Sequence, residues 1–218
     1  MNLDTHAARE QMISQQLRTW GVLDERVLHA VRAVARENFV PAAFQSLAFT
    51  DENLPLAHSQ VMLAPKLEAR ILQSMNIDST DQVWIIGAGN GHLAACAAQL
   101  AAKVRVTEVH GDLADQARRN LQATVSNNVY VDNVDALKLA LNKVYNVIIV
   151  TGSLPRPQPQ LEQALAIGGR LFAVIGQSPV MTAMTVTRTG EHTWTREALF
   201  ETDIPPLPNT IEPSTFVF

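Results

Sequence analysis

The sequence has one cysteine and little excess charge of either sign. Cys96 cannot form an internal disulfide, and the six histidines show no spacing typical of a metal site. The 17 lysine and arginine residues face 21 aspartate and glutamate residues, so no overall positive field is available to attract a phosphate backbone. These features predict a protein that holds no metal, works in a reducing compartment and does not have nucleic acid as its main partner.

Long apolar runs are also missing. The Ala/Leu-rich stretch 93–104 is interrupted by Gln99 and Lys103, and a bilayer span needs about 20 apolar residues. The first residues, MNLDTHAAREQ, lack the basic flank and apolar run of a signal peptide. We therefore expect a cytoplasmic protein without a membrane segment. Its 218 residues predict a single domain, with an N-terminal helical and loop region (1–65) and a core (66–218).

Helical periodicity dominates the N-terminal region. A helix behind Asp4 or Thr5 would place four apolar residues near one face: Ala8, Met12, Leu17 and Trp20. A second helix is expected to begin at Asp24, with a buried stripe of Val27, Leu28, Val31 and Val34. A third is expected over 66–75, with Leu67, Ile71, Leu72 and Met75 at helical spacing.

From Gln82 onward, short apolar strands alternate with helices. The expected strands are 83–87, 103–108, 128–131, 145–151 and 169–176, and the expected helices between them are 91–102 and 112–123. Such alternation predicts parallel βαβ units, because parallel strands need a crossover connection. Residues 180–187 and 192–199 instead alternate in period two across a turn, which predicts an antiparallel hairpin. This mostly parallel α/β sheet, with a C-terminal antiparallel hairpin and an N-terminal helical extension, resembles the Rossmann-like class I S-adenosylmethionine-dependent methyltransferases.

The segment VWIIGAGNGH predicts a ligand loop. Gly87, Gly89 and Gly91, with Asn90 among them, lie where a strand ends and a helix begins, so that a ligand can lie against bare peptide groups. Glu108 ends the next strand, about 20 residues on, where an acidic side chain can accept hydrogen bonds from both ribose hydroxyls of an adenosine. The loop and the acid together favour adenosine binding over a plain tight turn.

The spacing of the glycines favours one adenosine cofactor over another. A nicotinamide-binding loop needs a small residue at its sixth position, where this chain has His92. His92 either caps or packs the helix that it opens, or it contacts the ligand. Asp135, after the third strand, could accept the adenine amino group. We therefore predict S-adenosylmethionine as the cofactor, and an NAD-dependent oxidoreductase is the less favoured alternative.

Several segments resemble the protein-L-isoaspartate O-methyltransferase family over roughly residues 10–200. They are MISQQLRTWGVLDERVLHAVRAVARENFVP, LPLAHSQVMLAPKLEARIL, IIGAGNGHLAA, YNVIIVTGSLP and GGRLFAVIG. The resemblance implies methylation of the free carboxylate of isoaspartyl residues in damaged proteins, with S-adenosylmethionine as methyl donor. The acceptor would then be a protein or peptide carboxylate, or a small molecule if the chain has diverged.

The chain departs from the family in the loop that the family writes P-I-G-x-G-Q-T-I-S-Q-P. The hydroxyl residues that contact substrate in the family fall on Val61 and Leu63, neither of which can donate a hydrogen bond. The acidic residue that opens the family's glycine motif falls on Ile85. The substrate loop retains three polar residues, His58, Ser59 and Gln60, of which Ser59 could replace a lost hydroxyl. We therefore predict slow isoaspartyl turnover, and a catalytically degenerate binding protein on the same fold is the alternative.

Overall fold

The computed structural model describes residues 3–124, 127–140 and 144–210, and its centre is a seven-stranded sheet. The strand order is β5-β4-β3-β6-β7-β8-β9. The first five strands in this order run parallel, and β8 and β9 are antiparallel to their neighbours. The strand bounds are β3 Gln82–Ile86, β4 Lys103–Glu108, β5 Val129–Asn133, β6 Tyr145–Leu154, β7 Leu165–Gln177, β8 Val180–Gly190 and β9 Thr193–Thr202.

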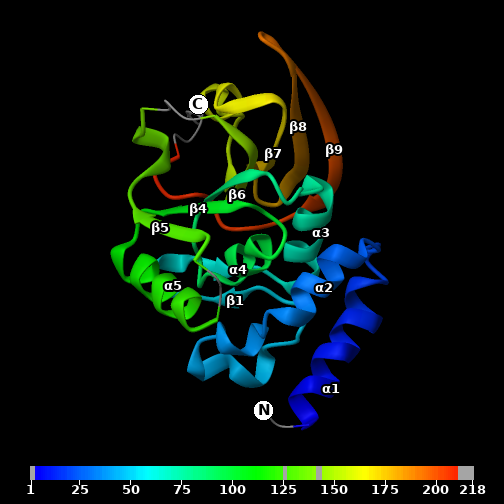
Figure 1. Cartoon of the computed structure of the whole chain (residues 1–218). Coiled ribbons are helices and arrows are strands. Elements are labelled where there is room, and N and C mark those ends of the chain that lie inside the picture. The colour runs from blue at the N-terminus through cyan, green and yellow to red at the C-terminus, as the bar shows by residue number, and fades with distance from the viewer. Residues whose placement is uncertain (1–2, 125–126, 141–143, 211–218) are drawn as a thin grey trace.

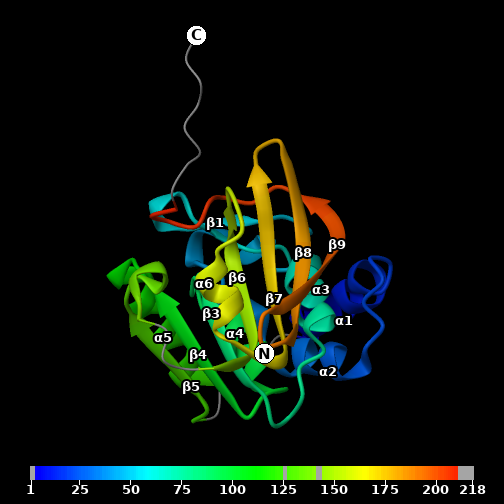
Figure 2. The same cartoon turned by 90° about the horizontal axis from the view of Figure 1, so that it is seen from above.

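Side chains alternate between the two faces of this sheet, and each face has its own hydrophobic cluster. Val83 and Ile85 belong to the larger cluster with α3 (Pro65–Met75), α4 (His92–Ala98) and α5 (Gly111–Thr124). Trp84 and Ile86 belong to the smaller cluster on the other face, with α6 (Pro159–Gln163). Helices therefore cover both faces, as a parallel sheet requires (Figures 1 and 2).

The N-terminal region packs on the larger cluster beside α3. It contains α1 (Leu3–Gln11), a π-helical segment (Met12–Leu17) and α2 (Glu25–Ala33), which Asp24 caps by accepting from the Arg26 N–H. The 3₁₀ segments Arg36–Asn38 and Ala42–Leu47 follow, and the short strands β1 (Leu54–Pro55) and β2 (Val61–Met62) form a separate antiparallel pair. The expected apolar stripes of α2 and α3 are buried.

Trp20 is not on the buried face that the N-terminal pattern suggested. Met12 and Leu17 are buried, whereas Trp20 is 48% exposed. The π-helical turns between them have a wider spacing than an α-helix, so Trp20 is rotated off the face that an α-helical count assigns to it. Its ring instead lies against the Lys66 ammonium, 4.1 Å from the ring centroid.

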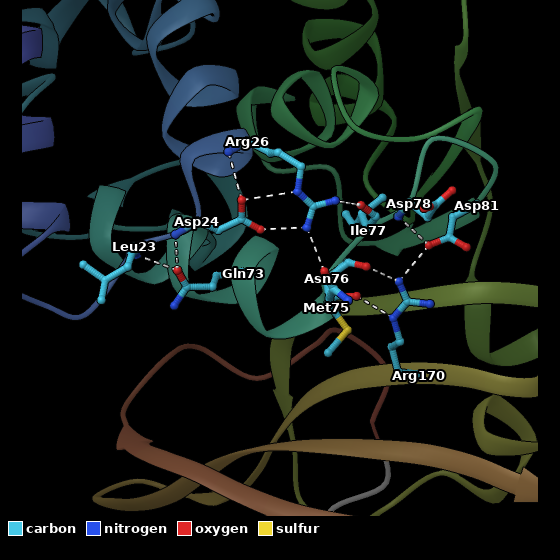
Figure 3. A network of polar contacts seen from close by, with 10 residues as sticks. All are labelled: Leu23, Asp24, Arg26, Gln73, Met75, Asn76, Ile77, Asp78, Asp81 and Arg170. Carbon is cyan, nitrogen blue, oxygen red and sulfur yellow. Dashed lines mark hydrogen bonds and ion pairs between the residues drawn. The ribbon is translucent and has the colours of Figure 1, made fainter.

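A polar network fixes the end of α3 that lies away from the candidate site (Figure 3). Gln73 Oε1 accepts the backbone N–H groups of Leu23 and Asp24, and Arg26 donates to the Asn76 side chain and the Ile77 carbonyl. Arg170 of β7 donates to the carbonyls at the end of α3 and pairs with Asp81 at 2.7 Å. The network thus joins α2, α3 and the sheet at one place.

After β9, the chain returns across the carboxyl ends of the parallel strands. We call residues 203–210 the C-terminal strap. Ser153 N–H donates to the Pro205 carbonyl and Leu207 N–H to the Ser153 carbonyl, each at 2.9 Å. A Cβ atom at Gly152 would lie 2.7 Å from the Leu207 nitrogen, so only glycine lets the strap approach so closely. The strap therefore covers the edge of the sheet where the glycine loop begins.

The predicted fold class is confirmed, and every expected strand and core helix is present, β4 with the expected ends and the others with shifted ends. The helix expected over 91–102 ends at Ala98, and strands β6 and β7 are longer than the apolar runs that predicted them. In the ranges that the structure describes, no helix is both long and apolar enough to cross a membrane.

Candidate cofactor and acceptor site

The glycine loop lies at the carboxyl end of β3, between β4 and β6. Chain order reverses at this point, since β4 and β5 lie on one side of β3 and β6 on the other. In open α/β sheets, ligands bind in the crevice outside such a switch point. The Thr151 hydroxyl of β6 donates to the Ile86 and Gly87 carbonyls, at 3.0 and 3.1 Å, and holds the start of the loop against the sheet.

Glycine is needed at the three predicted positions for different structural reasons. All have positive φ, which L side chains rarely adopt. A Cβ atom would lie 2.1 Å from Thr151 Oγ1 at Gly87, and 3.3 Å from Leu121 Cγ at Gly91. At Gly89, however, the nearest atoms, Leu56 Cδ1 and the Val61 carbonyl oxygen, would lie 3.8 Å away, an ordinary contact distance. Packing therefore requires Gly87 and Gly91, whereas at Gly89 only the positive φ calls for glycine.

Glu108 is buried at the end of β4, with its carboxylate directed at the glycine loop. One oxygen accepts the Ala88 N–H at 2.9 Å and the other accepts the His110 N–H at 3.0 Å. An ionised carboxylate has about four lone-pair sites, so about two remain. Glu108 can therefore accept further hydrogen bonds from a pair of hydroxyls, as its predicted role with a ribose requires.

Asp135 caps a 3₁₀ turn, Ala136–Lys138, that follows β5. Its Oδ1 accepts the Leu137 N–H at 3.0 Å, and its Oδ2 accepts from the Asn209 side chain at 2.9 Å. Lys138 Nζ lies 3.2 Å from the same Oδ2. The carboxylate predicted to receive the adenine amino group thus holds the strap as well.

One cavity joins three of the six predicted cofactor residues. Its walls include Gly87, Glu108 and Asp135 from the sheet edge, Gln60 from the substrate loop, and Leu207 with Pro208 from the strap. Its volume is about 20 Å³, enough for one water molecule. The donor and acceptor groups of the cavity fit an adenosine. Because the cavity is much smaller than an adenosine, the loop or the strap must move outward to admit one.

Asn90 was predicted to bind the cofactor, but its side chain points into the protein. Its side chain is buried and donates to the Phe39 carbonyl at 2.7 Å. The Asn120 side chain in turn donates to the Asn90 carbonyl. Asn90 therefore ties the loop to the N-terminal region and to α5, and its role toward a cofactor stays a prediction.

The substrate loop holds two adjacent non-glycine residues in the left-handed region, His58 at φ 57° and Ser59 at φ 56°. Such strain persists only where surrounding contacts hold it, and it is common at functional sites. His58 Nε2 lies 2.8 Å from Asp112 Oδ1, and its ring stacks on His110 with centroids 4.0 Å apart. The hydrogen bond from His58 lowers the pKa of Asp112. These contacts fasten the loop to the start of α5, beside Glu108.

Val61 and Leu63 lie on the inner side of this loop. Leu63 is buried in the larger hydrophobic cluster, and Val61 is partly buried against it. Ser59 is exposed. Ile85 is 1% exposed in β3, so no charge occupies that position. The structure therefore places apolar side chains where the family has hydroxyl and acidic groups.

His92 belongs to a buried charged cluster with Arg36 and Glu68. Glu68 Oε2 accepts from Arg36 Nη1 and lies next to His92 Nδ1, both at 2.6 Å. Arg36 also donates to the Leu63 and Ala48 carbonyls. Burial alone raises a carboxyl pKa, but His92 and Arg36 outweigh it, and the pKa of Glu68 is lowered. His92 therefore packs and pairs, the first of its two predicted roles.

Cys96 is also buried, and its Sγ lies 3.7 Å from His92 Nε2. Burial raises the pKa of this thiol well above its usual value, so the thiolate that would act as a nucleophile is disfavoured. No group of residues suited to hold a metal ion occurs in the described parts of the chain.

Sequence reasoning missed the strap as part of the site. Leu207 and Pro208 line the cavity, and Asn209 contacts Asp135 across 74 positions of sequence. The signal available was an apolar, proline-rich segment, IPPLP, directly after the last strand. The Arg36–Glu68–His92 cluster was also missed, because its members lie on separate elements.

A parallel sheet with a glycine loop at its switch point and an acid at the end of the next strand is the arrangement of an adenosine-binding α/β protein such as a class I methyltransferase. The family model described as protein-L-isoaspartate(D-aspartate) O-methyltransferase matches residues 7–207. The chain belongs to this family and is an S-adenosylmethionine-dependent methyltransferase. Its predicted family, enzyme class and cofactor are confirmed, ahead of the nicotinamide alternative.

Individual relatives agree with the family model. The protein-L-isoaspartate O-methyltransferase of Koribacter versatilis is 38% identical over 83% of this chain and 81% of its own length. Protein-L-isoaspartate O-methyltransferase 1 of Rhodopseudomonas palustris is 37% identical over 78% of this chain and 70% of its own. A Plasmodium falciparum protein assigned to the same activity, solved with S-adenosyl-L-homocysteine, shares the fold, with a TM-score of 0.82 at 17% identity over 93% of this chain and 99% of that one.

Proposed function

We propose that this protein transfers a methyl group from S-adenosylmethionine to a carboxylate of a protein or peptide, and that isoaspartyl residues are slow acceptors. The cavity formed by Gln60, Gly87, Glu108 and Asp135 carries this proposal, because it joins the substrate loop to the predicted adenosine site. The names of the curated relatives point to isoaspartate as the acceptor.

The chemistry makes modest demands on the protein. A carboxyl group with a pKa near ~4 is already ionised at neutral pH, so the acceptor needs no general base. When bound, S-adenosylmethionine supplies a methyl group on a positively charged sulfur. The residues of the chain have to align the acceptor oxygen with this carbon and exclude water. Positioning groups therefore determine the rate.

The loop supplies few such positioning groups. A hydrogen bond to a charged group contributes about 1.5–3 kcal/mol, so two missing hydroxyls correspond to a rate loss of about two orders of magnitude or more. Val61 and Leu63 cannot donate, and the exposed Ser59 would need a shifted loop to replace them. We expect the purified protein to bind S-adenosylhomocysteine yet to methylate isoaspartyl peptides slowly.

The test is transfer of labelled methyl groups to an isoaspartyl peptide, with an active family member measured alongside. Val61→Thr is the informative variant, because it adds a hydroxyl at nearly constant volume to a partly buried side chain. Val61→Ala is its control without a hydroxyl. A faster Val61→Thr and an unchanged or slower Val61→Ala would support the positioning argument.

A second variant adds Leu63→Ser, which removes a buried side chain, so its melting temperature must be measured before its rate. Wild-type rates close to those of the active family member would contradict slow turnover. Binding of S-adenosylhomocysteine with no methyl transfer by any variant would favour the catalytically degenerate binding protein.

Charge and composition bear on the class of acceptor and on the compartment in which the protein works. The formal net charge of -4 and the lack of an overall positive field argue against nucleic acid as the acceptor, and the names of the curated relatives support a protein or peptide carboxylate. The single, buried Cys96 supports a reducing compartment such as the cytoplasm. Methylation assays with peptide, RNA and DNA acceptors would test the first of these proposals.

A further inference from the structure

A second cavity, which we call the α3–β9 cleft, opens on the far side of the substrate loop. It has a volume of about 450 Å³. Its walls are Trp20, residues 51–53, the first turns of α3 with Ala64, and residues 200–203 at the end of β9 and the start of the C-terminal strap. Gln60 of the substrate loop lines the first cavity, and Ala64, at the end of the same stretch of chain, lines the second. A chain that places an acceptor group at the loop can therefore extend into the cleft.

Arg70 presents a cation to this cleft. Its guanidinium carbon lies 3.6 Å from the centroid of the Phe200 ring. In the part of the chain that the structure describes, no carboxylate or carbonyl is hydrogen-bonded to it. A guanidinium stacked on a ring keeps its edge N–H groups available, and that edge matches a carboxylate in a two-bond pair. Partial burial lowers the pKa of Arg70, as expected for a cation without an anionic partner.

Lys66 lies one helical turn before Arg70 and provides a contrast. Its ammonium contacts the Trp20 ring and also pairs with Asp51 Oδ2 at 2.7 Å. Its charge is therefore balanced within the protein, whereas that of Arg70 is not. Both residues stand on α3, whose far end is held by the network of Figure 3. The cation of the cleft thus has a rigid support.

The rim of the cleft is acidic. Glu52, Glu201 and Asp203 are exposed around its mouth, and charges in this position act weakly through solvent. They repel a polyanion such as a nucleic acid, and they leave Arg70 as the cation with which a single carboxylate can pair. Neutral or basic neighbours on the ligand would suit the rim. The charge pattern therefore selects a peptide with one acidic group among neutral or basic residues.

We propose that the α3–β9 cleft is a substrate subsite in which Arg70, stacked on Phe200, binds a second carboxylate of the peptide or protein substrate, apart from the carboxylate that is methylated. The subsite rests on the proposed function, because the peptide is placed by its acceptor group. Through this subsite, Arg70 determines which peptide sequences around the methylated residue the protein prefers.

The experiment uses pairs of isoaspartyl peptides that differ only by glutamate or glutamine, with this residue moved stepwise along the peptide. At one spacing, the wild-type KM should be about tenfold lower for the glutamate peptide, the effect of one charged hydrogen-bonded pair. Arg70→Gln should abolish this preference without changing kcat or the affinity for S-adenosylhomocysteine. Arg70→Lys should restore part of it, and the control Lys66→Gln should leave it intact.

Equal KM values for both peptides at every spacing in the wild type, or a preference that survives in Arg70→Gln, would overturn the subsite. If no peptide is methylated, the proposed methyl transfer fails, but the subsite is not yet tested. A direct measurement of peptide binding then tests the subsite. Fluorescence polarisation of the labelled peptides on the protein saturated with S-adenosylhomocysteine should still show tighter binding of the glutamate peptide, lost in Arg70→Gln. Equal binding of both peptides there would also overturn the subsite.

Discussion

Glu108 shows how a single buried carboxylate can serve the fold and a ligand together. Its two backbone hydrogen bonds fix the glycine loop and the start of α5. We predict that Glu108→Ala weakens S-adenosylhomocysteine binding by about 1–3 kcal/mol, the cost of losing a charged acceptor. Calorimetric titration would measure it, with Glu197→Ala, an exposed carboxylate on β9, as control. An unchanged dissociation constant would place the ligand elsewhere.

Substitutions at the glycines separate effects on the stability of the fold from effects on cofactor binding. Gly89→Val should leave a folded protein, because its Cβ would meet Leu56 and Val61 at an ordinary contact distance of 3.8 Å, although a side chain at φ 52° costs about 1–2 kcal/mol. It should abolish cofactor binding by filling the ligand's space. Gly87→Ala should instead destabilise the fold, since its Cβ would meet the Thr151 hydroxyl. Thermal unfolding with and without S-adenosylhomocysteine separates the two, and ligand stabilisation of Gly89→Val would contradict the assignment.

At the scale of elements, the strap and the substrate loop close the cofactor cavity. Because that cavity holds about one water molecule, an adenosine can enter only when one of these segments moves. The Asn209 side chain fastens the strap to Asp135. We predict that Asn209→Ala accelerates association of S-adenosylhomocysteine several-fold, measured by stopped-flow tryptophan fluorescence.

The control for this prediction is Ser178→Ala, which removes the hydrogen bond to Asp203 at the other end of the strap. It should leave the association rate unchanged, because Asp203 lies outside the cofactor cavity. Equal rates for the wild type and Asn209→Ala would show that the substrate loop, held by His58 and Asp112, opens instead.

At the scale of the whole molecule, the Arg36–Glu68–His92 cluster joins the N-terminal region to the core. Removing one partner of a buried pair leaves an unpaired charge, so Glu68→Gln should destabilise the protein by about 3–5 kcal/mol. The folded pKa of Glu68 is lowered, so its contribution is complete above the unfolded pKa and lost as pH falls through the folded value. Urea unfolding at neutral and acidic pH should show a smaller difference between wild type and variant in acid, and an equal difference would contradict the pairing.

The organisation of residues 1–218 as a single domain stays a prediction. It is supported by the larger hydrophobic cluster, which contains Leu17 and Leu28 of the N-terminal region together with Val83 and Val147 of the sheet. In the urea experiment, a single domain requires the wild type to unfold in one transition by both circular dichroism and tryptophan fluorescence.

The sequence predicted those features that local patterns determine. The apolar run of β6 and the glycine turn after β3 need no knowledge of distant residues, and the structure has both the strand and the turn where they were predicted. The displacement of Trp20 depends on a π-helical segment that α-helical periodicity does not anticipate. The Asn209–Asp135 contact and the pairing of Arg36 with Glu68 arise only when separate elements meet, so no local pattern could reveal them.

The strap also has a consequence for synthesis of the protein on the ribosome. Chain order places Leu207 and Pro208 after every other wall of the cofactor cavity, so they leave the ribosome last. A nascent chain can pair β3, β4 and β6 beforehand, but its cavity stays open on one side. A cofactor bound at that stage would lack the contacts of Leu207 and Pro208, so the sheet must first form on the strength of its own apolar contacts.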